Sequence, residues 1–452
     1  MLNDLIASIM VILAGGLPLL GWLGRYRRDE VPLLQLSVVA HLLSAVALIF
    51  VYRYYYSDGG DILNFYDEGL RLTEWMREDF FVATPQVLRL ILQLDSSVPL
   101  NYYTVGNSTG TMCGLAALAM FGVNDSLYAA CMLVSFLSFL GKLSIYTVFR
   151  ESLPSRYHRR VLLGTMLVPS VVFWSSGLIK EAFALAGLGY IFLGVHRLMA
   201  GRRWAWALVV AGGLLIAVVK PYILFSFVLS AAMWYYWARS SMPGALEIRP
   251  FHLVVGAILA VVGLTLLGTV FPNFALSSVG EAAGKQREVS LTIEAGSNFN
   301  IGASGDRSVL GQLGYAPVAL LTTLFRPTLF EVNNPVMFVN ALETTVLTWL
   351  LAASVWRRGW RGLWAVVSAT PVLMFCLVFT VSLGVGVGLT STNLGTLSRY
   401  RIPLMPFFAV LVLVWTRSAS AAERIPAQKR PPASPERIRR QSVVGATARR
   451  RS

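Results

Sequence analysis

Residues 31–52 read VPLLQLSVVAHLLSAVALIFVY, an apolar run without any Asp, Glu, Lys or Arg. A helix needs about 20 consecutive, mostly apolar residues to cross the hydrocarbon core of a bilayer. Residues 126–148 and 253–270 form comparable runs. The sequence therefore predicts helices that span a membrane.

The composition of the whole chain supports this prediction. Hydrophobic residues make up 56% of the 452 residues and charged residues only 13%, and the mean hydropathy is +0.62. An ordinary soluble domain carries about 25% charged residues. A net charge of +15 on a soluble domain would suggest a nucleic-acid-binding protein. Here the basic residues lie in short loops between apolar runs, which argues against nucleic-acid binding.

Cysteine and histidine give no sign of a metal centre. Cys113, Cys131 and Cys376 are odd in number, lie in apolar stretches and lack metal-ligand spacing, so we expect them to pack in the core. The four histidines are scattered and form no paired ligand motif.

We predict an all-α, polytopic integral membrane helical bundle with about eleven transmembrane helices. The predicted spans are 5–24, 31–52, 126–148, 161–176, 181–198, 204–219, 222–238, 252–272, 335–355, 363–384 and 402–416. Residues 1–416 form the transmembrane domain in this interpretation. The tail, 417–452, is rich in Arg, Ala, Pro and Ser and is expected to be disordered at an anionic membrane surface.

Arginine distribution predicts the orientation. Alternate loops and the tail carry most of the 38 basic residues, and short basic loops stay in the cytoplasm. The prediction is therefore a cell (inner or plasma) membrane protein with its N-terminus outside, its C-terminus in the cytoplasm and an odd number of spans. Because residues 1–4 contain no basic residue, we interpret the first span as a retained anchor rather than a cleaved signal peptide.

Two non-cytoplasmic segments, 53–125 and 272–334, are too long to be simple connections, and such loops usually carry function. Each contains an apolar piece, 110–123 and 310–325. If either piece crossed the membrane, the arginine-rich loops after it would lie on the non-cytoplasmic side, against the rule that such loops stay in the cytoplasm. We expect both pieces to be interfacial or half-inserted helices.

The first outer segment contains the motif Asp58-Gly59-Gly60-Asp61, where an amphipathic helix is predicted to begin near Asp61. A carboxylate at the lip of a membrane cavity can act as a general base, and Asp61 is the first candidate and Asp58 the second. The alternative is that Ser57 or Asp58 caps this helix and Asp61 complements its dipole. The two aspartates could jointly bind a divalent cation, although no cofactor is required and no metal ligand is assigned.

Five cations are predicted to face the same compartment as these aspartates: Lys180, Lys220, Arg326, Arg399 and Arg401. Such a set suits a phosphate-bearing ligand, because the guanidinium fork matches phosphate oxygens. Nearby acids, Glu181, Glu331 and Glu343, are expected to support the site by pairing with one or two of the cations. The alternative for Lys180 and Glu181 is that they extend to the membrane surface from a helix end.

Several short motifs carry a family resemblance: MFGVND at 120–125, YTVFR at 146–150, VKP at 219–221 and RYRIP at 399–403. Over residues 58–406 the chain resembles the GT-C superfamily of polyprenyl-phosphate-dependent glycosyltransferases, particularly the family 39 type. An additional span precedes the aspartate motif, and Lys180-Glu181 has no counterpart that we can assign.

The resemblance implies a membrane glycosyltransferase that moves a sugar from a polyprenyl-phosphate-linked donor to an envelope glycan, lipid or protein on the non-cytoplasmic side. Asp61 or Asp58 would deprotonate the acceptor hydroxyl, and the basic residues would hold the leaving lipid phosphate. The aspartate motif and the span count also resemble O-antigen and exopolysaccharide polymerases. A transporter or flippase for lipid-linked sugars is the third alternative, although no internal repeat supports it.

Overall fold

The computed structural model describes residues 2–55, 60–94, 97–98, 100, 107–240, 299 and 314–417. Every regular element within these ranges is helical, which confirms the predicted all-α class. The α-helices are α1 (Leu2–Val11), α2 (Leu17–Leu23), α3 (Val31–Tyr54), α4 (Gly60–Glu78), α5 (Phe80–Ile91), α6 (Ser108–Gly122), α7 (Leu127–Ser152), α8 (His158–Met166), α9 (Pro169–Trp174), α10 (Lys180–Met199), α11 (Trp206–Val219), α12 (Tyr222–Ser240), α16 (Ala316–Phe325), α17 (Pro335–Ser368), α18 (Pro371–Thr390), α19 (Leu394–Tyr400) and α20 (Met405–Trp415).

Six of the described helices are long and apolar enough to cross a membrane, and a seventh crossing is reached if α19 and α20, bent by 78°, count as one span. The six are Leu2–Leu23, α3, α7, α10, α17 and α18. A multi-pass membrane protein is therefore supported, but the predicted count of about eleven is not confirmed. The predicted span 252–272 lies outside the described residues.

The predicted span 161–176 is instead broken into α8 and α9. Val168 has ψ 118° and precedes Pro169, the first residue of α9. Proline cannot donate a backbone hydrogen bond and disfavours helical geometry in the preceding residue, so the helix stops there. The predicted span 363–384 is also shifted, because α17 continues to Ser368 through a kink at Gly359 and α18 starts only at Pro371.

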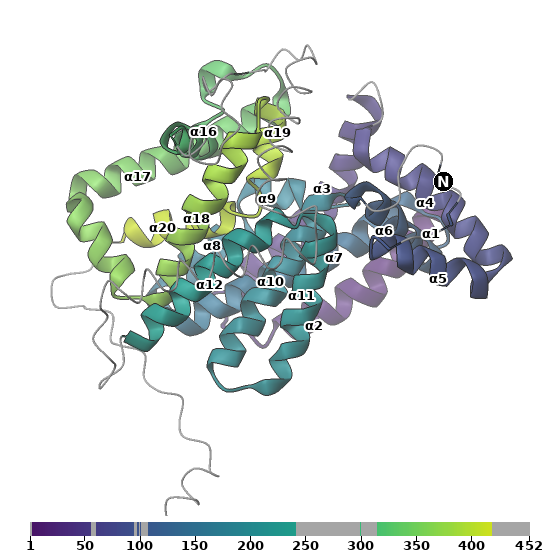
Figure 1. Ribbon diagram of the computed structural model, residues 1–452, viewed down its shortest axis with the longest axis horizontal. Coiled ribbons are helices and arrows are strands. Elements are labelled where there is room, and N and C mark those ends of the chain that lie inside the picture. Colours follow the sequence, from purple (N-terminus) through teal and green to yellow (C-terminus); the bar gives the residue numbers. More distant parts are fainter. Residues whose placement is uncertain are drawn as a thin grey trace, which may run out of the picture.

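The buried centre of the bundle is formed by α7, α10 and α20. Around it, α3 and α8 pack against α7, α11 packs against α10, and α18 packs against α20. Small residues let α7 and α10 approach closely, since a Cβ atom added to Gly189 would lie 1.9 Å from the Gly141 carbonyl oxygen. A separate lobe of α4, α5 and α6 lies at the opposite side of the molecule from α16 and α17 (Figure 1).

Ion pairs and hydrogen bonds identify the two ends of the bundle. At one end Arg150 pairs with Glu30, and Arg197 pairs with Glu151. Arg417, near the end of the described chain, donates to the Arg156 carbonyl at this same end. At the other end Asn3 exchanges hydrogen bonds with Asn124, where α7 begins. Residues 3 and 417 therefore lie near opposite ends of α7.

Candidate functional site

A cluster of charged side chains lies at the end of the bundle opposite to the Arg150–Glu30 and Arg197–Glu151 pairs. Asp61 is the first residue of this cluster in the sequence. Asp61 lies in the first turn of α4, as predicted. Gly60 precedes it with φ +55°, and a Cβ atom at Gly60 would lie 2.6 Å from the ring of Tyr52. Glycine is therefore needed both for the backbone conformation and for the close approach that sets Asp61 above the end of α3.

Arg399 joins two acids that are far apart in the sequence. Its Nη2 donates to Asp61 Oδ2 at 2.6 Å, and its Nε lies 3.5 Å from Glu181 Oε1. The guanidinium also lies over the ring of Trp174, with its Cζ 5.3 Å from the ring centroid. This bridge brings α4, α10 and α19 to one point, which is the arrangement the sequence predicted for Asp61 and Arg399.

Lys220 forms the third charged contact of the cluster. Its Nζ donates to Glu181 Oε1 at 2.9 Å and lies 4.6 Å from the ring centroid of Tyr400. Lys220 is 4% exposed and Glu181 is fully buried. Buried charges are retained in proteins when they are paired in this way, so Glu181 holds Lys220 and Arg399 together inside the bundle.

Lys180 differs from these two cations in its partners. Its Nζ donates to the hydroxyls of Ser108 at 3.0 Å and Thr109 at 3.2 Å, at the start of α6. It also lies 5.9 Å from the ring centroid of Phe65. Among the described residues, no carboxylate is within salt-bridge distance of Lys180. Its charge is therefore less neutralised than that of Lys220 or Arg399.

The remaining two predicted cations lie at α16 and after α19, apart from these contacts. Arg401 is fully buried and donates to the carbonyl oxygens of Thr323 and Arg326 and to the Thr344 hydroxyl. Arg326 forms an ion pair with Glu331. Partial burial would raise the pKa of the Glu331 carboxyl, but hydrogen bonds from Arg326 and Thr328 outweigh it and hold that pKa below its usual value.

We expected one or two of the five cations to pair with acids, and the structure shows three: Lys220, Arg326 and Arg399. The expectation was too low because a sequence does not show which charges are buried together. Glu343 was one of three acids predicted as possible partners of these cations. Instead, its carboxylate accepts hydrogen bonds from the backbone N–H and the hydroxyl of Ser170, at 2.8 and 2.7 Å.

Glu343 and Lys142 complement the two half-helices α8 and α9. Glu343 lies at the N-terminal, positive end of α9, whereas Lys142 donates at 3.4 Å to the Met166 carbonyl at the negative end of α8. Lys142 is fully buried in the middle of α7. A lysine inside an apolar run is a sequence signal of a polar interior contact, and sequence reasoning missed it.

Sequence reasoning also missed the aromatic side chains around the cations: Phe65, Trp174 and Tyr400. The sequence alone does not distinguish an aromatic ring that lies beside a cation from one that packs in the core. Asp58, the second candidate base, lies outside the described residues, so its role and the joint cation site remain predictions. Within the described ranges, no group of three His, Cys, Asp or Glu side chains could hold a metal ion.

No protein-family model matches this chain, and comparison with the curated proteins and with the solved structures found no match. The function is therefore argued from the geometry of the site.

Proposed function

We propose that this protein is an integral membrane glycosyltransferase that transfers a sugar from a polyprenyl-phosphate-linked donor to an acceptor hydroxyl. The proposal depends on one observation: a partly exposed aspartate, Asp61, forms an ion pair with Arg399 in a cluster of charged side chains at one end of the bundle. The Asp61 side chain is 44% exposed, whereas Glu181 behind it is fully buried. Asp61 is thus the carboxylate that a substrate can reach.

The proposed reaction assigns one step to each part of the cluster. Asp61 accepts the proton of the acceptor hydroxyl, whose oxygen forms a bond to the anomeric carbon of the donor sugar. The bond from that carbon to the phosphate oxygen breaks, and its electron pair leaves with the lipid phosphate. Lys180 and the guanidinium of Arg399 stabilise the negative charge that develops there.

Lys180 is the cation best suited to bind the phosphate. Its hydroxyl partners, Ser108 and Thr109, are neutral and can be replaced by phosphate oxygens at a small electrostatic cost. Lys220 would have to leave a buried carboxylate. We therefore assign Lys220 and Glu181 to positioning Arg399, and Lys180 to direct contact with the donor.

Replacing Lys180 with Met tests this assignment. A hydrogen bond to a charged group contributes about 1.5–3 kcal/mol, so we expect the donor KM to rise by roughly 10- to 100-fold. The protein should remain folded because no buried acid loses its partner. Arg27→Met is a matched control, since Arg27 and its partner Asp29 are both about half exposed and lie outside the cluster. An unchanged donor KM in Lys180→Met would remove Lys180 from the donor site.

The non-cytoplasmic side is proposed for the cluster because it lies at the end opposite to the arginine pairs of α7 and α10. The acceptor decides between two forms of the activity. If it is a lipid-linked repeat unit, the protein is an O-antigen or exopolysaccharide polymerase; if it is another envelope glycan, a lipid or a protein, the protein is a single-sugar transferase.

One observation favours the alternative of a transporter for lipid-linked sugars. Transporters often bind substrates where a helix is broken within the membrane. The break between α8 and α9, with Lys142 at one half-helix end and Glu343 at the other, has that form. Both charges, however, are satisfied by backbone groups of the half-helices, which favours a structural role for them.

A further inference from the structure

Arginine side chains from three separate helices come together at the end of the bundle opposite to the Asp61 cluster. Arg160 lies in the first turn of α8, Arg358 directly precedes the kink of α17, and Arg417 follows the end of α20. The helix α20 packs against both α8 and α17. We call Arg160, Arg358 and Arg417 the arginine cluster.

Hydrogen bonds and charge repulsion show that the members of the arginine cluster are neighbours. Arg160 Nη1 donates to the Thr416 hydroxyl at 3.0 Å, next to Arg417 in the chain. Arg417 Nη1 in turn donates to the Arg156 carbonyl at 3.0 Å, one turn before Arg160. Partial burial is the main cause that lowers the pKa of the Arg160 guanidinium, and repulsion from Arg417 and Arg358 lowers it further.

No acid in the described part of the chain neutralises the arginine cluster. The acids at this end of the bundle contact other basic side chains, in the pairs Arg27–Asp29, Arg150–Glu30, His158–Glu30, His196–Glu151 and Arg197–Glu151. Moreover, Arg358 Nη2 is buried and has no hydrogen-bond partner among the described residues. A buried donor without a partner is costly, and like charges without a counter-charge repel one another. An anion bound among the three guanidinium groups would remove both costs.

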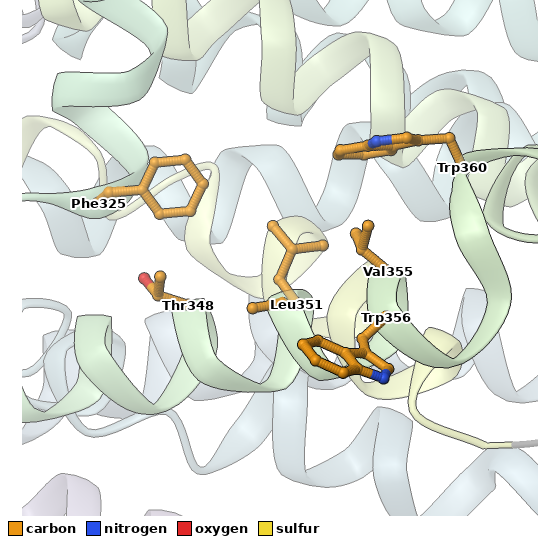
Figure 2. A pocket seen from close by; sticks show the side chains of 7 residues that line it. Phe325, Thr348, Leu351, Val355, Trp356 and Trp360 are labelled. Carbon is orange, nitrogen blue, oxygen red and sulfur yellow. The ribbon is translucent and has the colours of Figure 1, made fainter.

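Exposed tryptophans indicate where such an anion comes from. Trp356, Trp360 and Trp364, which flank Arg358 on α17, are 92%, 70% and 52% exposed. Figure 2 shows the indole rings of Trp356 and Trp360 on the two sides of the bend in α17. Tryptophan rings are enriched at the level of the lipid head groups. The arginine cluster therefore lies at the depth of the phosphates of a membrane leaflet.

We propose that the arginine cluster binds the phosphate of an anionic phospholipid from the leaflet at this end of the bundle. A phosphate oxygen accepts a hydrogen bond from Arg358 Nη2, and the charges of Arg160 and Arg417 attract the head group. Basic pockets between membrane helices recognise anionic head groups in this way. The bound lipid holds α8, α17 and α20 together where their own charges repel. The site lies far from the Asp61 cluster, so it does not depend on the proposed function.

The test measures binding of dioleoyl phosphatidylglycerol and dioleoyl phosphatidylcholine to the purified full-length protein by native mass spectrometry. Both lipids have the same acyl chains and a phosphate, but only phosphatidylglycerol has a net negative charge. We expect the wild type to prefer phosphatidylglycerol. In Arg358→Gln the affinity for this lipid should fall about tenfold, a loss of ~1.4 kcal/mol. The protein should remain folded because Arg358 Nη2 donates no hydrogen bond to the described chain.

Arg203→Gln is the matched control. Arg203 is exposed in the turn after α10, at the same end of the bundle, and it precedes the exposed Trp204. The substitution removes the same charge beside an exposed indole but outside the arginine cluster. Its affinity for phosphatidylglycerol should stay within about twofold of the wild type. Equal losses in Arg358→Gln and Arg203→Gln would show only a general attraction of anionic lipid to a basic surface and would overturn the assignment.

Competition with inorganic phosphate in large excess separates a lipid site from a site for a soluble anion. Phosphatidylglycerol should stay bound, because its acyl chains remain in the hydrocarbon beside the helices. If inorganic phosphate displaces it, the arginine cluster binds free anions and the lipid assignment is wrong. The assignment is also wrong if the wild type binds both lipids equally, or if Arg358→Gln keeps the wild-type affinity for phosphatidylglycerol.

Discussion

Asp61→Asn is expected to lower the rate of sugar transfer by about 10²- to 10⁴-fold, the usual contribution of a general base. Asparagine has nearly the same size and still accepts the hydrogen bond from Arg399, but it cannot take up the proton of the acceptor hydroxyl. The protein should therefore remain folded and bind its donor. The measurement is the initial rate of product formation in proteoliposomes, normalised to the amount of folded protein.

The matched control for this prediction is Asp67→Asn. Asp67 lies on the same helix as Asp61, is exposed to solvent and takes no part in the cluster. Its replacement should leave the rate unchanged. A transfer rate in Asp61→Asn within a few-fold of the wild type would show that Asp61 only complements the dipole of α4, which is the alternative that the sequence left open.

Glu181→Gln is expected to have the largest effect on stability. Within the part of the chain that the structure describes, Glu181 is the one acid paired with Lys220. Its replacement leaves a buried ammonium group without that counter-charge and weakens the contact with Arg399. Breaking a buried ion pair on one side typically costs about 3–5 kcal/mol. We expect a corresponding fall in the free energy of unfolding, or failure to accumulate in the membrane, measured by thermal unfolding of the purified protein.

Two further variants show whether charge is the cause. In the double variant Glu181→Gln with Lys220→Met the unpaired ammonium is gone, so stability should recover in large part. Asp29→Asn breaks an ion pair whose two side chains are about half exposed, and such pairs contribute about 0–1 kcal/mol. A double variant as unstable as Glu181→Gln alone would contradict the assigned role of Glu181.

Much of the site could be predicted from the sequence because its residues lie at helix ends. Lys180 starts an apolar helix and Lys220 follows another, and the alternation of apolar runs with arginine loops placed both on the same side as Asp61. Consecutive crossings run in opposite directions. Residues that are predicted to lie on the same side of the membrane are therefore also expected to lie near one another at one end of the bundle. The contact between Asp61 and Arg399 agrees with that reasoning.

The pairing within the group could not be predicted in the same way. Which carboxylate meets which cation depends on the packing of α10 against α11 and on the bend between α19 and α20, and neither follows from hydrophobic periodicity. Glu343 is an example: its position inside a span suggested an ion pair, but the broken helix α8–α9 offered it an exposed helix N-terminus. The break itself was signalled by Pro169, which we had placed inside a continuous span.

The predicted count of about eleven spans is not confirmed, and the length of the short helices is one reason. Short apolar segments such as α11, with 14 residues, read as spans when only the alternation of loops is considered. In the structure they are shorter than the ~20 residues that a straight crossing requires. The length of a helix and the side on which its ends lie are therefore separate predictions. The structure brings Asp61, Glu181, Lys220 and Arg399 into contact, whereas the number of spans is not confirmed.

In the proposed reaction, the Asp61 cluster cleaves the bond between a sugar and a lipid phosphate. The most direct test incubates the purified protein in liposomes with polyprenyl-phosphate-linked sugars and an acceptor glycan, and measures released lipid phosphate together with glycosylated product. We predict that both appear in equal amounts and that Asp61→Asn abolishes both. A donor that crosses the bilayer intact, with no release of lipid phosphate, would contradict the claim and identify the protein as a transporter.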